Sequence, residues 1–367
     1  MAKTVKLALI GGFLGAGKTT ALIEAGKRLV SEFDKRVAII TNDQGKVLVD
    51  TKIVEDSGFE ASEVLNGCFC CKFPDFIDSA HEVLKAANPD VILAEPVGSC
   101  TDLPATVLAP LRQYYQGEFR LAPLIVLVDA NFILYLSSKL NLLAPATPVG
   151  YLISHQIREA EVIGINKMDL VSSSQLTQIK NLMRKLCDRA EILTLSAKTG
   201  VGLDGLIDQI LHEDHHPYPS PGIDYDIYAT AESEMGWFNG SWDITAKKNF
   251  EAKNLLRDLL TETAKEIEKR GGEIAHLKVH FKAATNSIKA SLVALDQGVD
   301  FLGDVPNPIR QGSITMNARV KLDPRSVTQS IREALEAVVP KYDAGYGNWM
   351  AESISPPPPK PYYRLSE

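Results

Sequence analysis

Short runs of apolar residues recur along the first 212 positions of the chain, with segments of helical spacing between them. The runs are continuous rather than alternating, which is typical of strands that helices cover on both faces. Strands of this kind belong to a mostly parallel sheet in an α/β domain. The predicted strands are residues 5–10, 36–41, 91–94, 124–128, 162–165 and 191–195.

The pattern changes beyond residue 222. Residues 313–321 and 276–282 alternate between apolar and polar side chains, which indicates half-buried antiparallel strands. In the second of these strands, Leu277, Val279 and Phe281 are expected to point inward. Helices are predicted over residues 246–270 and along a stripe of apolar side chains, Val327, Ile331, Leu335 and Val338. This half of the chain therefore predicts a small α+β domain.

Prolines mark two further segments. Residues 212–222 contain three prolines and end in glycine, so they are predicted to be a linker. The proline run in residues 355–361 predicts an extended, weakly tethered tail. We expect a first domain over residues 1–212, a linker over 213–222, a C-terminal α+β domain over 223–345 and an extended Pro-rich tail over 346–367.

Composition and charge narrow the function. The 367 residues are 45% hydrophobic and carry a net charge of −7, which argues against partners with phosphate backbones or anionic lipid surfaces. We therefore expect no nucleic acid and no membrane among the partners.

Three of the five cysteines fall within four residues, which suits no disulfide framework and favours a reducing cytoplasm. The apolar run at residues 5–10 is too short for a signal peptide, and no run is long enough for a membrane helix.

A phosphate-binding motif follows the first predicted strand. Residues 12–19, Gly-Phe-Leu-Gly-Ala-Gly-Lys-Thr, fit G-x-x-x-x-G-K-[ST] in the strand-to-helix position that a P-loop needs. Its backbone N–H groups would surround phosphate oxygens, the Lys18 ammonium would meet the outer phosphates, and the Thr19 hydroxyl would reach Mg²⁺. The first domain is thus predicted to be a P-loop NTPase, with nucleotide contacts from Gly12, Gly15, Ala16, Gly17, Lys18, Thr19 and Thr20.

Two later loops are predicted to recognise the base of the bound nucleotide. Asn166, Lys167 and Asp169 directly follow a predicted strand. An Asp carboxylate in the base pocket accepts from guanine N1–H and N2–H₂, whereas adenine leaves it unsatisfied. Ser196, Ala197 and Lys198 follow the next strand and would present backbone N–H to the guanine carbonyl. The two loops behind a P-loop predict GTP rather than ATP as the nucleotide.

Glu95 ends a predicted buried strand. If that strand neighbours the P-loop strand, the carboxylate lies where the γ-phosphate and Mg²⁺ would be. Lys18, Thr19 and Glu95 are therefore the predicted catalytic residues, and Thr19 and Glu95 the predicted Mg²⁺ ligands. A helix-capping or loop carboxylate is the alternative interpretation of Glu95.

Cys68, Cys70 and Cys71 form the third motif. Soft thiolates suit Zn²⁺, Cu⁺ or Co²⁺, and we expect Zn²⁺ or Co²⁺ here. Three thiolates are one short of a closed tetrahedral site, and a water, a carboxylate or a remote group such as Cys100 could complete it. The alternative is that these cysteines are small buried apolar residues.

Histidines supply weaker candidates. His212, His215 and His216 lie in the predicted linker, where exposed histidines usually have no function. His276 and His280 share the outer face of a predicted strand with Lys278, and we interpret this face as solvated.

Taken in order, these motifs resemble the CobW-like GTPases, which are relatives of the urease and hydrogenase nickel-insertion GTPases. The resemblance covers about residues 5–212. It rests on the P-loop, on residues 41–45 where the family carries a switch segment, and on the Asn-Gly-Cys-Phe-Cys-Cys run at residues 66–71. Further motifs are Glu95-x-x-Gly98, Val128-Asp129-Ala130, Gln156-Ile157 and Asn166-Lys167-x-Asp169. One departure is Lys46, where the family often has an acidic residue.

The resemblance implies a GTP-hydrolysing metallochaperone or metal-cofactor assembly factor. We expect slow intrinsic GTP hydrolysis, because no arginine finger is evident from the sequence. Its partners would be a metal-dependent client protein or a cofactor-assembly enzyme. Whether two P-loop domains pair as a homodimer stays open. Two alternatives remain: a GTP-gated protein-binding adaptor with structural or redox cysteines, and a corrinoid-related cofactor assembly GTPase.

Overall fold

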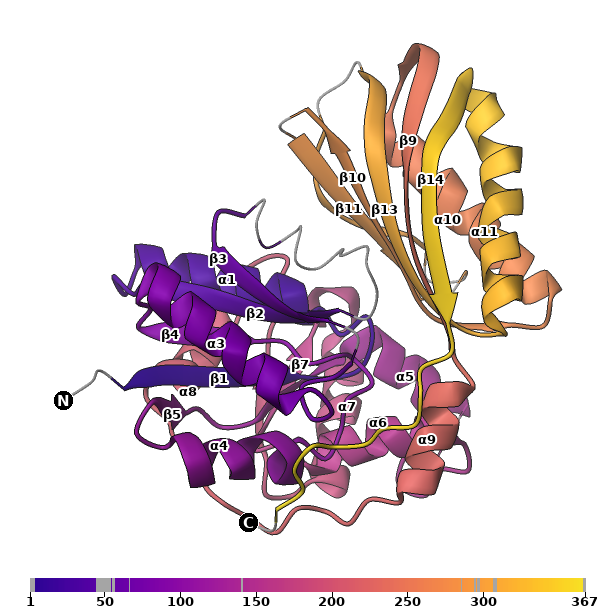
Figure 1. Cartoon of the computed structure of the whole chain (residues 1–367). Helices are drawn as coiled ribbons and strands as arrows, with labels where there is room; N and C mark the ends of the chain where they lie inside the picture. The colour runs from indigo at the N-terminus through magenta and orange to yellow at the C-terminus, as the bar shows by residue number, and fades with distance from the viewer. Residues whose placement is uncertain are drawn as a thin grey trace. The chain divides into compact units, whose positions relative to one another are not determined.

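The chain folds into two compact units in the computed structural model (Figure 1). The structure describes residues 4–43, 54, 57–65, 67–139, 141–284, 286–293, 295, 298–305 and 309–365. The first unit contains the described residues up to Ala229 together with those from Pro359 onward. The second unit contains the described residues from Thr230 to Pro358.

The first unit is built on a parallel sheet with the strand order β3-β2-β4-β1-β6-β7-β8, and β5 also pairs with β1. The strands are β1 (Val5–Gly11), β2 (Val37–Asp43), β3 (Glu60–Leu65), β4 (Val91–Ala94), β5 (Phe119–Leu121), β6 (Ile125–Asp129), β7 (Val162–Asn166) and β8 (Glu191–Thr194). All six strands predicted from the apolar runs are confirmed. The structure adds β3 and β5, which the apolar pattern did not reveal.

Helices alternate with these strands, as the α/β pattern requires. They are α1 (Lys18–Ser31), α3 (Phe73–Ala87), α4 (Ala109–Tyr115), α5 (Ala130–Lys139), α6 (Pro148–Arg158), α7 (Ser173–Leu186) and α8 (Leu203–Leu211), while α9 (Tyr225–Ser233) spans the boundary between the two units in sequence. Short helical turns are η1 (Pro104–Leu108) and η2 (Met168–Leu170). Every residue of β1, β4, β6 and β7 is buried, which explains their continuous apolar sequence. The predicted mostly parallel α/β fold is confirmed.

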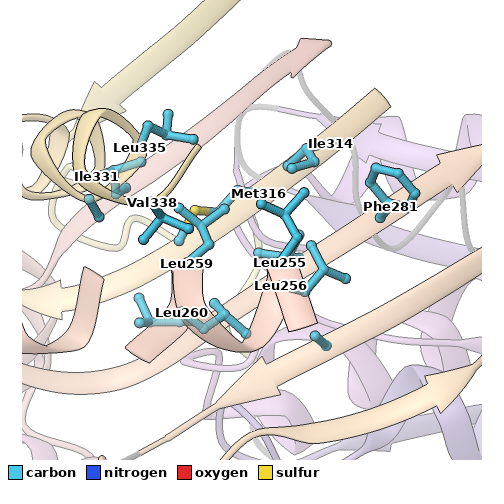
Figure 2. Packing of buried hydrophobic residues seen from close by; sticks show 14 of the residues in the cluster. Leu255, Leu256, Leu259, Leu260, Phe281, Ile314, Met316, Ile331, Leu335 and Val338 are labelled. Atoms are coloured by element: carbon cyan, nitrogen blue, oxygen red, sulfur yellow. The ribbon is translucent and has the colours of Figure 1, made fainter. Parts of the chain in front are cut away.

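The second unit is an antiparallel sheet with the order β12-β11-β10-β13-β9-β14. Its elements are β9 (Gly236–Phe250), α10 (Ala252–Lys269), β10 (Glu273–Ala283), β11 (Asn286–Leu292), β12 (Asp300–Gly303), β13 (Ile309–Lys321), α11 (Pro324–Val338), η4 (Val339–Tyr342) and β14 (Ala344–Ile354). Figure 2 shows apolar side chains of α10 and α11 packed with those of β10 and β13 in one core. The predicted α+β character is confirmed.

Two local predictions in this unit are wrong. Residues 246–250, predicted as the start of a helix, belong to β9, because Ala246 pairs with Ala344 of β14. The helix begins only at Ala252. The outer face of β10 is not solvated, since His276, Lys278 and His280 are 5%, 8% and 4% exposed.

The predicted linker and tail differ from the structure. His215 N–H donates to Leu121 O at 3.0 Å, and Lys6 Nζ lies 2.7 Å from Asp214 Oδ1, so residues that we assigned to a linker pack on the first unit. Strand β14 occupies residues 344–354 and therefore includes the start of the predicted tail. Residues 360–365, called the C-terminal segment below, form hydrogen bonds within the first unit. They are therefore not weakly tethered, in contrast to what the proline run predicted. Among the helices that the structure describes, none combines the length and hydropathy needed to cross a lipid bilayer.

We expect Leu259→Ala to destabilise the second unit by about 2 to 5 kcal/mol, since it opens a cavity at a fully buried position of α10. Urea unfolding followed by tryptophan fluorescence checks this, because all three tryptophans (Trp237, Trp242 and Trp349) lie in this unit. Lys265→Ala, at an exposed position of the same helix, should shift stability by less than about 0.5 kcal/mol. Equal midpoints for the two variants would contradict the packing described here.

Candidate nucleotide and metal sites

The P-loop connects β1 to α1. Gly12, Gly15 and Gly17 have φ angles of 127°, 79° and 87°, a backbone region that side chains other than glycine rarely adopt. A Cβ at Gly12 would lie 2.1 Å from Leu127 O, and one at Gly17 would lie 2.4 Å from Asn166 Nδ2. These two glycines are therefore required by close packing as well as by conformation. Ala16 is buried and Thr20 is half-buried at the start of α1.

Lys18, Thr19 and Glu95 come together at the end of the P-loop. The Thr19 hydroxyl donates to Glu95 Oε1 at 3.2 Å, and Lys18 Nζ lies 3.8 Å from the same oxygen. Lys18 Nζ also donates to Gly12 O at 2.9 Å. All three side chains are buried, at 6% exposed for Lys18, 3% for Thr19 and 6% for Glu95. The expected adjacency of β4 and β1 is what brings Glu95 to this point.

Asn166 connects the P-loop to the two predicted base-selecting loops. Its side-chain Nδ2 donates to Ala16 O at 2.8 Å, and its Oδ1 accepts from Ala197 N–H at 3.0 Å. Asn166 is 1% exposed at the end of β7. One buried amide thus fixes the P-loop and residues 196–198 in a common arrangement.

The other residues of the two predicted base-recognition loops differ in their exposure and in their contacts within the protein. Lys167 has a positive φ of 59° and its Nζ lies 2.7 Å from Asp129 Oδ2. Asp169 is exposed on η2, where a ligand can reach its carboxylate. Ser196 N–H donates to Val201 O and Ala197 N–H to Asn166, so these two amides are used within the protein, and Lys198 is exposed. Guanine contacts by residues 196–198 stay a prediction.

Cys68, Cys70 and Cys71 lie in the loop between β3 and α3, and their Sγ atoms are all within 4.8 Å of one another. The Cys70 Sγ is 3.8 Å from that of Cys71 and 2.7 Å from that of Cys68. A fourth thiol joins them from the loop after β4, because Cys100 Sγ is 3.6 Å from Cys70 Sγ. The sequence analysis named Cys100 among several groups that could complete the site but not among the predicted metal ligands, and the structure places its sulfur beside Cys70.

Contacts among the thiols shift their acidities in opposite directions. S–H groups of Cys68 and Cys70 that donate to Cys100 lower the pKa of that thiol to about 6, against the opposing effect of burial. The hydrogen bond with Cys68 raises the pKa of Cys71 to about 12. The pKa of Cys70 is raised well above its usual value, first by its hydrogen bond with Cys100. The cluster therefore favours a negative charge at Cys100, as a site for a soft cation requires.

Asn42, at the end of β2, holds the cysteine loop. Its Nδ2 donates to Gly67 O at 2.7 Å, and its Oδ1 accepts from Phe69 N–H at 3.0 Å. These two residues flank Cys68. Asn42 belongs to the predicted switch segment, of which residues 44 and 45 lie outside the described residues, as do Lys46 and Asn66.

A second connection runs along the loop after β4, from Glu95 to Cys100. A Cβ at Gly98 would lie 3.1 Å from the backbone nitrogen of Leu14, so this loop packs directly on the P-loop. Gln156 of α6 fastens it, since its Nε2 donates to Gly98 O at 3.0 Å and to Cys100 O at 2.9 Å. Gln156, known from the sequence only as part of a family motif, therefore has a structural role in holding this loop.

The C-terminal segment bonds to the same region of the first unit. Lys360 N–H donates to Cys71 Sγ at 3.2 Å, and Tyr362 N–H donates to Cys70 O at 2.8 Å. Arg364 Nε donates to Asp102 Oδ2 at 2.8 Å, and the Asp102 carboxylate is fully buried. Long-range contacts of this kind leave no local pattern in the sequence.

The linker histidines do not form a metal cluster among the described residues. His215 is 8% exposed and its Nδ1 lies 2.6 Å from Glu161 Oε2, while His212 and His216 are exposed. His215 thus stabilises the packing of residues 212–222 on the first unit.

The fold and these sites define a P-loop nucleotide-binding protein that also carries a thiol cluster able to hold a metal ion. The chain belongs to the CobW/HypB/UreG family, whose nucleotide-binding domain matches residues 6–194. It is 28% identical over 214 residues to the zinc chaperone CobW of Sinorhizobium sp, a match of 52% of this chain and 58% of that protein. It is 27% identical over 197 residues to zinc-regulated GTPase metalloprotein activator 1 of Schizosaccharomyces pombe, a match of 52% of this chain and 45% of that protein. The chain thus spans about half the length of these curated relatives.

Two solved structures are also similar to the chain. The Zn(II)-bound YjiA GTPase of E. coli has 14% sequence identity and a TM-score of 0.37, with coverage of 91% of this chain and 99% of that one. The nickel complex of HypB from Helicobacter pylori has 18% identity and a TM-score of 0.40, with coverage of 56% and 85%.

Proposed function

We propose that this protein is a GTP-hydrolysing zinc chaperone, in which GTP binding at the P-loop controls a zinc ion held by Cys68, Cys70 and Cys71. The observation that carries the proposal is the position of Asn42. Asn42 lies in the predicted switch segment, near the end of β2, and its side chain is hydrogen-bonded to both residues around Cys68. A change at the end of β2 therefore moves the metal loop directly.

The nucleotide half of the proposal rests on the P-loop and Glu95. Lys18 supplies positive charge to the outer phosphates, and the P-loop amides orient them. The Thr19 hydroxyl and the Glu95 carboxylate offer two buried oxygens 3.2 Å apart, a donor set that fits a hard divalent cation. These two residues would hold Mg²⁺, which neutralises charge on the phosphates when bound. Asp169 provides the preference for guanine.

The metal half rests on sulfur spacing. Zinc–sulfur bonds of about 2.3 Å in a tetrahedron place neighbouring sulfurs about 3.8 Å apart. The Cys70–Cys71 separation of 3.8 Å matches this edge. Cys68 and Cys70 are closer, at 2.7 Å, so metal entry requires these sulfurs to separate by about 1 Å. Zinc is preferred over cobalt as cargo because of the two zinc-related relatives, and the client would be a zinc-dependent protein in the cytoplasm.

A three-cysteine variant tests the coupling. Zinc and cobalt titrations of untagged protein, with and without a non-hydrolysable GTP analogue, should give affinities that differ by about 5- to 150-fold. Metal must then change GTP affinity by the same factor, and its binding should release protons and weaken as the pH falls. Replacing Cys68, Cys70 and Cys71 together by Ser should remove metal and coupling but leave GTP affinity in metal-free buffer unchanged.

The outcomes separate the rival functions. Equal metal affinities in the two nucleotide states would refute the coupling, and a triple variant that keeps its metal would refute the site. GTP binding without any thiol-bound metal would favour the protein-binding adaptor. Thiol-bound corrinoid in place of a bare ion would favour the cofactor assembly GTPase.

A further inference from the structure

We propose that Cys100 is the fourth ligand of this metal site, so that the protein holds zinc with four sulfurs and opens the site by withdrawing Cys100. The inference rests on the proposed function and adds to it a residue outside the Cys-x-Cys-Cys motif. It follows from the meeting of two separate loops at one cluster of sulfur atoms.

One separation fits Cys100 as a ligand, while the three sulfurs that all lie within 4.8 Å of one another are those of Cys68, Cys70 and Cys71, so metal binding requires the Cys100 sulfur to move closer to the motif. The Cys100 Sγ is 3.6 Å from that of Cys70, close to the sulfur separation of about 3.8 Å in a tetrahedral zinc site. Cys100 is 2% exposed, so water has little access to the fourth position from its side. Two hydrogen bonds hold Cys100 in this position, because its N–H donates to Val97 O at 2.8 Å and its carbonyl accepts from Gln156.

Four protein sulfurs close a zinc site, whereas three leave a position open to a client ligand. Release therefore requires one sulfur to leave. Cys100 is suited to this because its loop begins at Glu95, which contacts Thr19 and Lys18 of the P-loop. A change at the nucleotide would reach Cys100 from Glu95 through the four residues 96–99, of which Gly98 packs on the P-loop. The three motif cysteines remain on their own loop.

Cobalt substitution in the full, untagged chain tests the ligand. Cobalt bound by the wild type should show the spectrum of four thiolates, and Cys100→Ser should reduce the sulfur-to-cobalt charge-transfer intensity to about three quarters. Zinc affinity should fall at least about 10-fold. Cys187→Ser is the matched control, because Cys187 is also buried but its Sγ lies against Arg158 O and Ala160 O. It should leave spectrum and affinity unchanged.

X-ray absorption of the zinc-loaded wild type counts sulfurs without any substitution, so the proposal does not depend on whether a variant folds. Four sulfurs support it. Three sulfurs, or a Cys100→Ser spectrum identical to that of the wild type, overturn Cys100 as a ligand and leave the zinc chaperone function standing. A wild type with no thiolate-bound metal overturns the proposed function itself.

We further infer, from separate contacts, that the C-terminal segment fastens the two ligand loops together. It bonds to the first loop at Cys70 and Cys71, and to the second loop through Arg364 and Asp102, two residues after Cys100. Tyr363 packs edge-on against Phe73 of α3, with ring centroids 5.4 Å apart. The Lys360 N–H bond to Cys71 Sγ is an outer contact of the kind that stabilises metal ligands.

A proline substitution at Lys360 isolates the hydrogen bond from Lys360 N–H to Cys71 Sγ. Lys360→Pro removes the backbone N–H, whereas Lys360→Ala keeps it and is the matched control. We expect zinc transfer to a chelator to be about 10- to 100-fold faster from Lys360→Pro than from wild type or Lys360→Ala. Equal rates for the proline and alanine variants would overturn the fastening role. A second arm, Arg364→Ala, should also accelerate transfer, and an unchanged rate there would count against the same role.

Discussion

We expect Lys18→Ala to lower GTP hydrolysis at least about 100-fold, because it would remove a positive charge from the transferring phosphate. Thr19→Ala should have a comparable effect by removing a Mg²⁺ ligand and the hydroxyl that donates to Glu95 at 3.2 Å. Phosphate release under saturating GTP measures both. The wild-type rate of GTP hydrolysis should itself be slow, well below about 10 s⁻¹, because no arginine finger is evident from the sequence.

Lys27→Ala is the control for these two variants. Lys27 lies on the same helix α1, but its side chain is 51% exposed and pairs with Glu24 on the surface. Its loss should leave hydrolysis within twofold of wild type. Turnover by Lys18→Ala at the wild-type rate, in protein that melts like the wild type, would show that the P-loop lysine does not act on the phosphate.

Asp169→Asn should weaken GTP binding by about 2 kcal/mol or more, which is about 30-fold in Kd. In the proposed base pocket the carboxylate would accept from two guanine donors, whereas the amide would replace one acceptor with a donor. Xanthosine triphosphate, which has a carbonyl where guanine has an amino group, should therefore regain affinity for this variant. Calorimetry with GTP, ATP and xanthosine triphosphate measures the exchange of preference.

Asp188→Asn supplies the matched substitution, since Asp188 is also an exposed aspartate of the first unit but lies after α7. It should leave all three affinities unchanged. Equal affinities of the wild type for ATP and GTP would refute the assignment of the base pocket.

The sequence predicts the centre of the first unit well because β1, β4, β6 and β7 are buried along their whole length. A strand such as β6, with every residue buried, must be continuously apolar, and such a run is visible without knowledge of its neighbours. Strand β3 has the sequence Glu-Ala-Ser-Glu-Val-Leu and lies at the edge of the sheet, so it carries no such run. Strand β5 has only three residues.

The second unit shows where local preference fails. Ala246, Lys247 and Lys248 favour a helix, but β9 pairs with β14 on one side and β13 on the other. Sheet pairing therefore outweighs propensity at these positions. His276, Lys278 and His280 are polar residues on a buried face, and their burial depends on the tertiary structure rather than on the alternation that revealed the strand.

For the candidate site, the motifs located the residues but not their connections. The pattern G-x-x-x-x-G-K-[ST] requires specific chemistry at fixed spacing, so it is visible in one sequence. The amide of Asn42 and the thiol of Cys100 act through contacts to residues 25 and 30 positions away. No spacing rule connects such pairs, since only the order of strands in the sheet brings them together.

The bond from Lys360 to Cys71 also sets an order of events during protein synthesis. The two residues are 289 positions apart, and residues 230–358 of the second unit are translated between them. At about 5 to 20 residues per second, Cys71 leaves the ribosome about 15 to 60 s before the Lys360 N–H that donates to it. For that interval the nascent chain carries its thiols without the fastening segment. Metal encountered during translation therefore meets a more open site than metal encountered by the finished protein.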